Sequence, residues 1–234
     1  MRLSKVIDLM FPPRCGVCDT VVCSGELVCP KCTSVIKPID RETCRKCGKG
    51  LLSTDRLYCY DCSRKIHYFE RGFSIFEYKD IKRSLYKFKY QGRAEYATFY
   101  AYAADMIHGD VLRGLNADGL IPVPIHKSRQ IKRGYNQAAL LAKELSKRIN
   151  VPVYDDFIIR QKATIPLKNL DEIGRANNLK KAFILGSNSV KLKTIVIIDD
   201  IYTTGSTIDA ISKVCLEAGV EKIYFLTVAI GRGL

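Results

Sequence analysis

Short apolar runs in the chain predict the strands of a parallel sheet. Residues 194–198 are mostly β-branched and show no alternation of polar and apolar positions, which is typical of a strand buried on both faces. Residues 120–126 form a second short apolar strand that breaks at two prolines. Four large apolar side chains between residues 67 and 78 indicate further strands: Phe69, Phe73, Ile75 and Phe76.

Apolar residues at helical spacing predict helices between these strands. A helix after residue 206 carries one apolar face and ends at Gly219. Further helices are expected from residues 134–137 to Ile149 and over residues 94–107. Strands alternating with helices over residues 67–234 predict an α/β domain with a parallel sheet flanked by helices. The apolar face of the helix after residue 206 is formed by Ile208, Ile211, Cys215 and Ala218.

Residues 1–66 have few large apolar residues and most of the cysteines, so they are expected to form a separate small module. Each Cys-x-x-Cys pair presents two thiolates to one ion, and two pairs complete a tetrahedral zinc site. Sequential pairing gives a double zinc ribbon, which is the expected module, and an interleaved arrangement is the alternative. Disulfides and redox pairs are the alternatives, but a redox motif seldom occurs in four copies. The predicted ligands of two structural zinc ions are Cys15, Cys18, Cys29, Cys32, Cys44, Cys47, Cys59 and Cys62.

The two remaining cysteines are Cys23, expected in a loop, and Cys215, expected in a helix core. The chain has 234 residues and a formal charge of +14, which eight thiolates and two zinc ions would lower to about +10. Such an excess favours a polyanionic partner, nucleic acid or an acidic protein, although a solvated basic face is also compatible with it. No apolar run is long enough for a membrane span, and the start is a poor signal peptide, so a cytoplasmic location is expected.

A candidate anion site follows the strand over residues 194–198. Asp199 and Asp200 stand where this strand is expected to end, and a turn rich in hydroxyl groups then enters the helix. Backbone amides of the turn and the helix N-terminus suit a phosphate, whereas the two carboxylates suit sugar hydroxyls or a metal ion. A ribose 5-phosphate suits both parts of this site, because it has a phosphate for the turn and hydroxyls for the carboxylates. The turn is Thr203, Thr204, Gly205, Ser206 and Thr207.

A second anion site is predicted after the strand over residues 120–126, on the same sheet edge. The strand breaks into a loop with several cations before the next helix opens. Two anion sites on one edge suit a ligand with phosphates at both ends. The candidate residues are Pro124, Ile125, His126, Lys127 and Arg133.

Basic and aromatic residues alternate over residues 79–93, as in many single-strand binding surfaces. The alternative is a helix with Ile81, Leu85 and Phe88 inward and its lysines in water. The candidate nucleic-acid contacts are Lys82, Arg83, Lys87, Lys89, Tyr90 and Arg93.

A basic, irregular segment over residues 160–181 has two interpretations: a surface loop, or a flap that excludes water from a reactive sugar phosphate. Arg160 and Arg175 are its candidate site residues.

Residues 195–207 closely resemble the phosphoribosyl pyrophosphate signature of the type I phosphoribosyltransferases: four apolar residues, two acids, two free positions, then Thr-Thr-Gly-x-Thr. The resemblance implies that fold, with Asp199 and Asp200 holding the ribose hydroxyls and residues 203–207 the 5-phosphate. It also implies Mg²⁺ bound with phosphoribosyl pyrophosphate, and a pyrophosphate loop at residues 122–127.

Several further motifs behind a cysteine module resemble the ComF family of competence proteins over nearly the whole chain: Pro-Val-Pro-Ile-His, Arg-Gly-Tyr-Asn-Gln-Ala, Arg160, Arg175-x-x-Asn178 and Lys181-Ala182-Phe183. The resemblance implies a role in DNA uptake beside the ComF helicase and the inner-membrane DNA channel, with a position at the inner face of the membrane. Leu167 replaces a glutamine that is usual in the family. If that glutamine contacts the acceptor or covers the site, this protein differs in which acceptor it can bind.

Two functions are therefore compatible with the sequence. In the first, which we favour, the phosphoribosyl pocket serves a protein that handles single-stranded DNA. In the second, the protein is an active phosphoribosyltransferase that transfers ribosyl phosphate to a nitrogen nucleophile. Release of ammonia from glutamine is not expected, because no glutaminase domain with an N-terminal cysteine is present.

Overall fold

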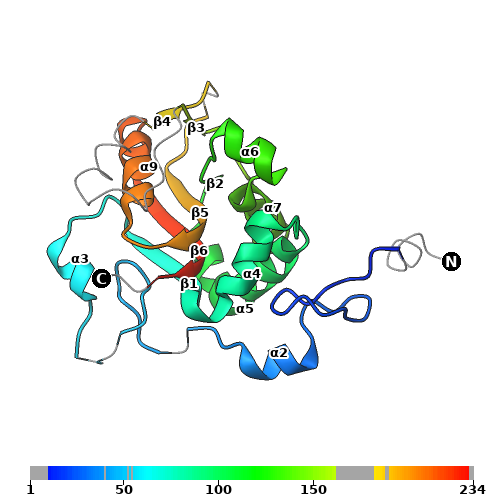
Figure 1. Ribbon diagram of the computed structural model, residues 1–234. Coiled ribbons are helices and arrows are strands. Elements are labelled where there is room, and N and C mark those ends of the chain that lie inside the picture. The colour runs from blue at the N-terminus through cyan, green and yellow to red at the C-terminus, as the bar shows by residue number, and fades with distance from the viewer. Residues whose placement is uncertain are drawn as a thin grey trace.

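The computed structural model describes residues 10–39, 41–51, 53, 55–161, 182–187 and 190–231 (Figure 1). Its centre is a parallel four-stranded sheet in the order β1 (Arg71–Glu77), β6 (Lys222–Ile230), β5 (Thr194–Tyr202), β2 (Gly119–Pro122). The parallel α/β sheet expected from the sequence is confirmed. A separate antiparallel pair, β3 (Ile158–Arg160) with β4 (Phe183–Leu185), lies near the top of the molecule in Figure 1.

Helices cover both faces of the sheet, which explains why β5 is apolar at successive positions. On one face lie α4 (Tyr78–Tyr90), α5 (Tyr96–Gly114) and α7 (Gln137–Ile149), and on the other lies α9 (Ser206–Glu217) (Figure 1). Val196 and Ile198 belong to the core beneath the first three helices, and Ile195 and Ile197 to the core beneath α9. Every apolar residue of this run is therefore buried.

The cysteine-rich segment forms two ribbons, each opened by a short antiparallel bridge, Arg14 with Val21 and Thr43 with Gly50. Each ribbon also carries a short helix, α2 (Pro30–Val35) in the first and α3 (Tyr60–Arg64) in the second. The first ribbon lies against α4, where its Gly16 carbonyl accepts a hydrogen bond from Ser84.

The second ribbon lies along the outer edge of β1. The Gly72 N–H donates to the Lys46 carbonyl at 2.7 Å, and the Ile39 N–H donates to the Ile75 carbonyl at 3.0 Å. A Cβ at Gly48, which has a φ of +75°, would lie 2.6 Å from the Gly72 carbonyl oxygen, so the close approach requires glycine. The edge of the sheet is thereby covered by backbone hydrogen bonds.

Several element boundaries differ from those expected. β5 continues through Asp199 and Asp200 to Tyr202, because its partner β6 remains paired with it as far as Ile230. The cations after β2 lie on a short helix, α6 (Lys127–Arg133), rather than in a loop. A single strand, β1, forms within residues 67–78, and α5 begins and ends later than residues 94–107.

Among the described residues, no helix combines the length and apolar character that a membrane crossing requires.

Candidate functional site

The carboxyl end of β5 projects beyond its neighbour β2. The β2–β5 pairing ends at Pro122 with Ile198, after which the Val123 N–H donates to the Ile198 carbonyl. From Asp199 onward β5 pairs only with β6. Asp199 and Asp200 therefore stand half-buried at the sheet edge where ligands of open α/β folds bind.

The two carboxylates have different surroundings. Asp199 Oδ1 accepts the Asp200 N–H at 2.8 Å, and burial, followed by the nearby Asp200 charge, raises the pKa of Asp199 to about 7. Asp200 forms an ion pair with Lys89 of α4, whose Nζ lies 2.9 Å from Oδ2. The pair thus combines one carboxylate that resists ionisation with one whose charge is already balanced.

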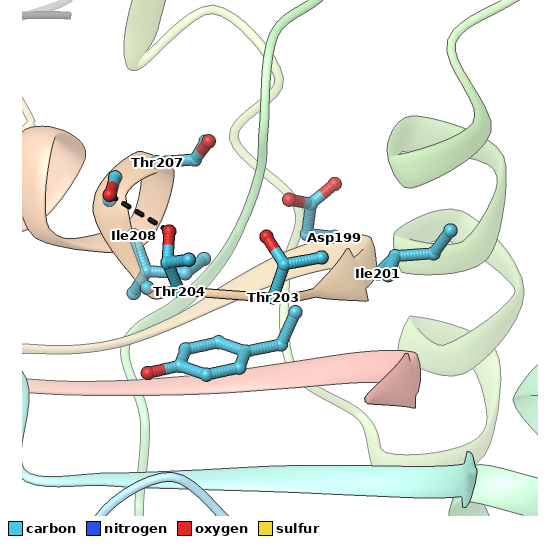
Figure 2. Close-up of a pocket in the computed structure, with 9 residues that line it drawn as sticks. Asp199, Ile201, Thr203, Thr204, Thr207 and Ile208 are labelled. Carbon is cyan, nitrogen blue, oxygen red and sulfur yellow. Dashed lines mark hydrogen bonds between the residues drawn. The ribbon is translucent and has the colours of Figure 1, made fainter. Parts of the chain in front are cut away.

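The turn after β5 has the features of a phosphate cradle. Gly205, with a φ of +77°, immediately precedes α9, and the Thr204 and Ser206 hydroxyls lie 2.9 Å apart. Asp199 and residues 201–208 line a pocket, and in Figure 2 the oxygens of Asp199, Thr203 and Thr204 point to the same side of the turn. The first amides of α9 have no acceptor within the helix, so they remain available to an anion.

The position of Gly205 admits no side chain. A Cβ there would lie 2.5 Å from the Tyr202 hydroxyl oxygen and 3.0 Å from His67 Cε1. Both the left-handed backbone and this close contact require glycine at the turn.

The loop after β2 lies on the same edge as the carboxylates. Pro124, Ile125 and His126 are half-buried there, and Lys127 is exposed. The His126 ring accepts the Ser128 N–H, which caps α6. The structure therefore brings the predicted pyrophosphate loop close to β5, as its sequence position suggested.

Arg133 faces α4 rather than this loop. Its Nη2 donates to the Tyr90 hydroxyl at 3.2 Å and its Nη1 donates to Gln137 Oε1 at 2.9 Å. The Tyr135 hydroxyl donates to the Phe88 carbonyl at 2.6 Å, and Gln137 Nε2 donates to the same carbonyl at 3.4 Å. These contacts hold the last turn of α4, from which Lys89 reaches Asp200.

Arg160 lies on β3, with its guanidinium 5.3 Å from the centre of the Phe183 ring. Burial lowers the pKa of Arg160, and the charge of Arg129 lowers it further, whereas the charge of Asp199 raises it. Arg160 and Asp199 therefore interact electrostatically. Arg175 and Leu167 lie outside the described residues.

The predicted nucleic-acid residues divide into two groups. The segment forms α4 with Ile81, Leu85 and Phe88 buried, which is the alternative weighed from the sequence. Lys82, Arg83 and Tyr90 are exposed. Lys87 and Arg93 instead form ion pairs with Asp19 of the first ribbon, and Lys89 pairs with Asp200.

Eight cysteine sulfurs form two clusters, each with its ligand atoms within 4.8 Å of one another. The Cys18 and Cys29 sulfurs lie 3.7 Å apart, as do those of Cys47 and Cys59. Sulfurs about 2.3 Å from a tetrahedral zinc ion would lie about 3.8 Å apart, so both clusters fit zinc. The sequential pairing holds, with Cys15, Cys18, Cys29 and Cys32 in one cluster and Cys44, Cys47, Cys59 and Cys62 in the other. Cys23 is exposed in a loop and Cys215 is buried in α9, as expected.

Three residues near the site were not identified as part of it from the sequence. Lys89 was predicted as a nucleic-acid contact, and nothing local indicated its ion pair with Asp200, which is distant in the chain. Lys65 and His67 follow the last cysteine pair and contact Thr204 and Asp209. A lysine and a histidine at a module boundary give no indication of such contacts.

Two family models match separate parts of the chain. Residues 6–63 match the family described as "Double zinc ribbon domain", and residues 135–233 match "Phosphoribosyl transferase domain". A purine phosphoribosyltransferase from Pyrococcus horikoshii is similar with a TM-score of 0.35 and 14% identity, covering 57% of this chain and 83% of that one. That likeness is too weak to add to the match of the family models.

Curated relatives match larger parts of the chain. "Competence protein F" of Haemophilus influenzae is 40% identical over 108 residues, which cover 45% of this chain and 47% of that protein. "DNA utilization protein YhgH" of Escherichia coli strain K12 is 27% identical, covering 92% of this chain and 96% of that protein. "Competence protein ComFC" of Bacillus subtilis is 28% identical, covering 83% and 80%. The first match thus spans about half the length of its relative, and the other two span most of theirs.

Proposed function

Because the chain is a ComF-family phosphoribosyltransferase-like protein with an N-terminal double zinc ribbon, we propose that it binds phosphoribosyl pyrophosphate with Mg²⁺ and acts in DNA uptake by contacting single-stranded DNA. The ComF helicase and the inner-membrane DNA channel are its proposed partners. The proposed site of action is the cytoplasmic face of the inner membrane.

The observation that carries the donor-binding proposal is the joint geometry of β5 and its turn. Asp199 lines the same pocket as Thr203, Gly205 and the start of α9. Carboxylates suit the 2- and 3-hydroxyls of a ribose, and the turn amides suit its 5-phosphate. The loop at residues 124–127 supplies the second anion site for the pyrophosphate.

Mg²⁺ would be held by the donor and by the carboxylate pair. Hard oxygen ligands suit this ion, and it would balance the pyrophosphate charge. Lys89 balances Asp200 until the ligand arrives, and Arg160 adds a second cation near Asp199. The chain's own contribution is therefore positioning and charge compensation.

The first test removes both carboxylate charges. Asp199→Asn with Asp200→Asn should weaken phosphoribosyl pyrophosphate binding at least about a hundredfold in calorimetry with Mg²⁺, since two charged partners of the ligand are lost. Asp105→Asn with Asp110→Asn on α5 makes the same charge change at a site where both acids pair with Arg113, so it is the matched control. Equal affinity in the wild type and the β5 variant would reject the proposed pocket.

Support for DNA contact comes from the exposed surface of α4. Lys82 and Arg83 are exposed beside Tyr86 and Tyr90, whose ring centres lie 5.2 Å apart. Cations neutralise phosphates and tyrosine rings stack on unpaired bases. The net charge of +14 favours the same partner.

The second test measures single-stranded DNA affinity over a salt series. Lys82→Ala with Arg83→Ala should weaken binding and reduce the slope of log affinity against log salt by about 1.4, since each phosphate contact contributes about 0.7. Lys143→Ala with Lys147→Ala on α7 removes the same charge from another surface. If the two double variants give the same slope of log affinity against log salt, α4 is not part of the DNA-binding surface.

The second candidate, active phosphoribosyl transfer, is supported by one observation. Arg160 on β3 interacts electrostatically with Asp199, and a cation beside the carboxylates would stabilise the charge that develops on a leaving pyrophosphate. Release of pyrophosphate from the donor in the presence of a panel of nucleobases would support turnover. If the donor stays intact with every nucleobase, the protein binds the donor without transferring its ribosyl phosphate.

A further inference from the structure

The second zinc ribbon reaches the phosphate turn directly. Lys65 follows α3, and its Nζ donates a hydrogen bond to the Thr204 carbonyl at 3.3 Å. A trans peptide group is planar, with its C=O and N–H on opposite sides. By fixing the Thr204 carbonyl on the ribbon side, Lys65 therefore directs the Gly205 N–H to the other side of the turn.

His67 makes a second connection, to the first turn of α9. Its Nδ1 lies 2.9 and 3.1 Å from the two carboxylate oxygens of Asp209, and the Tyr68 N–H donates to the same carboxylate at 3.1 Å. His67 and Asp209 are each 8% exposed, so this pair is shielded from water. Two consecutive residues of the segment leaving the ribbon are thus fixed to the helix that opens the phosphate site.

The space between the second cysteine cluster and the turn is packed with aromatic rings. The Phe69 ring stacks on His67 at 4.8 Å and meets Phe225 edge-on, while Tyr202 stacks on Phe225 at 4.8 Å. Tyr202 belongs to the same buried core as Cys47 and Cys59, so the ring lies on the side of the turn that faces the cluster. The Tyr202 hydroxyl also lies directly against Gly205 of the turn.

We propose that the second zinc ribbon is part of the phosphate site, with Lys65 and His67 as positioning residues for the 203–207 turn, so that zinc in this ribbon determines the affinity for a sugar 5-phosphate. The first ribbon has no such connection to the turn among the described residues. This inference rests on the proposed function, because it concerns the same ligand.

The sharpest test compares two lysines that line the same groove of the second ribbon. Lys65→Met keeps the apolar stem and removes the ammonium group that holds Thr204. Lys46→Met is the control, because it removes the same charge from the same groove, whereas the Lys46 ammonium makes no hydrogen bond or ion pair with the described residues 203–209. Calorimetry should show ribose 5-phosphate bound about tenfold more weakly by Lys65→Met, with the control close to the wild type.

Inorganic pyrophosphate is the second probe, because it reports on the loop after β2 rather than on the 203–207 turn. Lys65→Met should leave its affinity unchanged. Equal weakening for both probes would mean general destabilisation and would overturn the positioning role.

His67 is tested by loss and rescue. His67→Ala should weaken ribose 5-phosphate binding about tenfold, and His67→Asn should restore part of the affinity because an amide N–H can replace the Nδ1–H donated to Asp209. Wild-type affinity in both Lys65→Met and His67→Ala would also overturn the inference.

The role of zinc is tested with Cys62→Ser against Cys18→Ser, each followed by metal analysis. Each should lose one zinc ion per chain, but only Cys62→Ser should weaken ribose 5-phosphate binding. Unchanged affinity in a Cys62→Ser protein that has lost this zinc would contradict the proposal. If the wild-type protein binds neither ribose 5-phosphate nor phosphoribosyl pyrophosphate, the proposed function itself fails, a result separate from failure in the variants.

Discussion

Asp199 and Asp200 are adjacent in the sequence, yet their carboxylates are stabilised in different ways. Asp200 has Lys89 as a direct partner at 2.9 Å. Asp199 is desolvated and lies beside another acid, so burial and then the charge of Asp200 raise its pKa to about 7. An acid with a raised pKa reduces the stability of the folded protein once it ionises, and a bound Mg²⁺ or ribose would offset that cost.

This environment predicts the pH dependence of unfolding. A carboxyl whose folded pKa exceeds its unfolded value favours the folded state at low pH, and this contribution is lost as the pH rises from 3.8 to about 7. The free energy of unfolding of the wild type should therefore fall relative to that of Asp199→Asn as the pH rises from about 5.5 to 7, and stay level above. Urea unfolding at a series of pH values measures this difference.

Comparison with the variant cancels the pH dependence of the zinc ligands, which both proteins share. Asp105→Asn, at an ion pair that is partly exposed, is the control and should run parallel to the wild type. Parallel curves for wild type and Asp199→Asn would contradict the raised pKa.

At the scale of elements, the last turn of α4 connects the two candidate anion sites. Residues of the Arg133–Gln137 segment contact this turn through Tyr90 and the Phe88 carbonyl. Asn136 also donates to the Val123 carbonyl and caps α7. The position of Lys89 thus depends on the segment that follows the pyrophosphate loop.

Removing one hydroxyl should loosen this connection. Tyr135→Phe deletes the hydrogen bond to the Phe88 carbonyl and should lower the free energy of unfolding by about 1 kcal/mol, because that carbonyl loses a partner. Amide hydrogen exchange in residues 86–91 should accelerate at the same time.

Tyr102→Phe, at an exposed tyrosine of α5, is the matched control and should change neither quantity. Loss of stability without faster exchange at the end of α4 would show that Tyr135 does not hold that turn.

The sequence predicted the elements whose signals are local. β5 and α9 were identified because a β-branched run, a glycine and an apolar helical face lie within one segment, and the cysteine clusters because their spacing is short. The α6 helix was missed because residues 127–133 carry one large apolar residue, Ile131, and no periodic face. The Lys89–Asp200 and His67–Asp209 pairs join distant segments, so only the fold brings them together.

At the scale of the whole molecule, the two zinc ribbons differ in how they join the domain. The second shares a buried core with β5, β6 and α9, which includes Cys44, Cys47 and Cys59. The first keeps Cys15 and Cys32 in a small core of its own and packs Val17 and Leu27 against the helices. Its Asp19 carboxylate adds polar contacts to Lys87, Arg93 and the Tyr96 hydroxyl. Burial opposes ionisation of Asp19, but hydrogen bonds from these three residues bring its pKa down to about 2.

This difference predicts two phases of zinc release. Metal analysis should give two zinc ions per chain, and a chromogenic chelator should remove the zinc of the first cluster faster, because Cys18 is exposed whereas three ligands of the second cluster are buried. Asp19→Asn keeps a residue that tolerates the left-handed backbone at this position, with a φ of 72°. It should accelerate the fast phase alone.

Asp61→Asn, which removes the ion pair with Lys49 in the second ribbon, is the counterpart and should affect the slow phase. A single phase of release, or one zinc ion per chain, would contradict the independence of the two clusters.

The backbone contact between the second ribbon and β1 has a consequence for handling the protein. An uncovered outer strand offers a row of free N–H and C=O groups on which another chain can add. Here the carbonyl of Lys46 and the amide of Ile39 occupy part of that row. Purification in chelating buffers should therefore promote edge-to-edge aggregation, and zinc in the buffer should keep the preparation monodisperse.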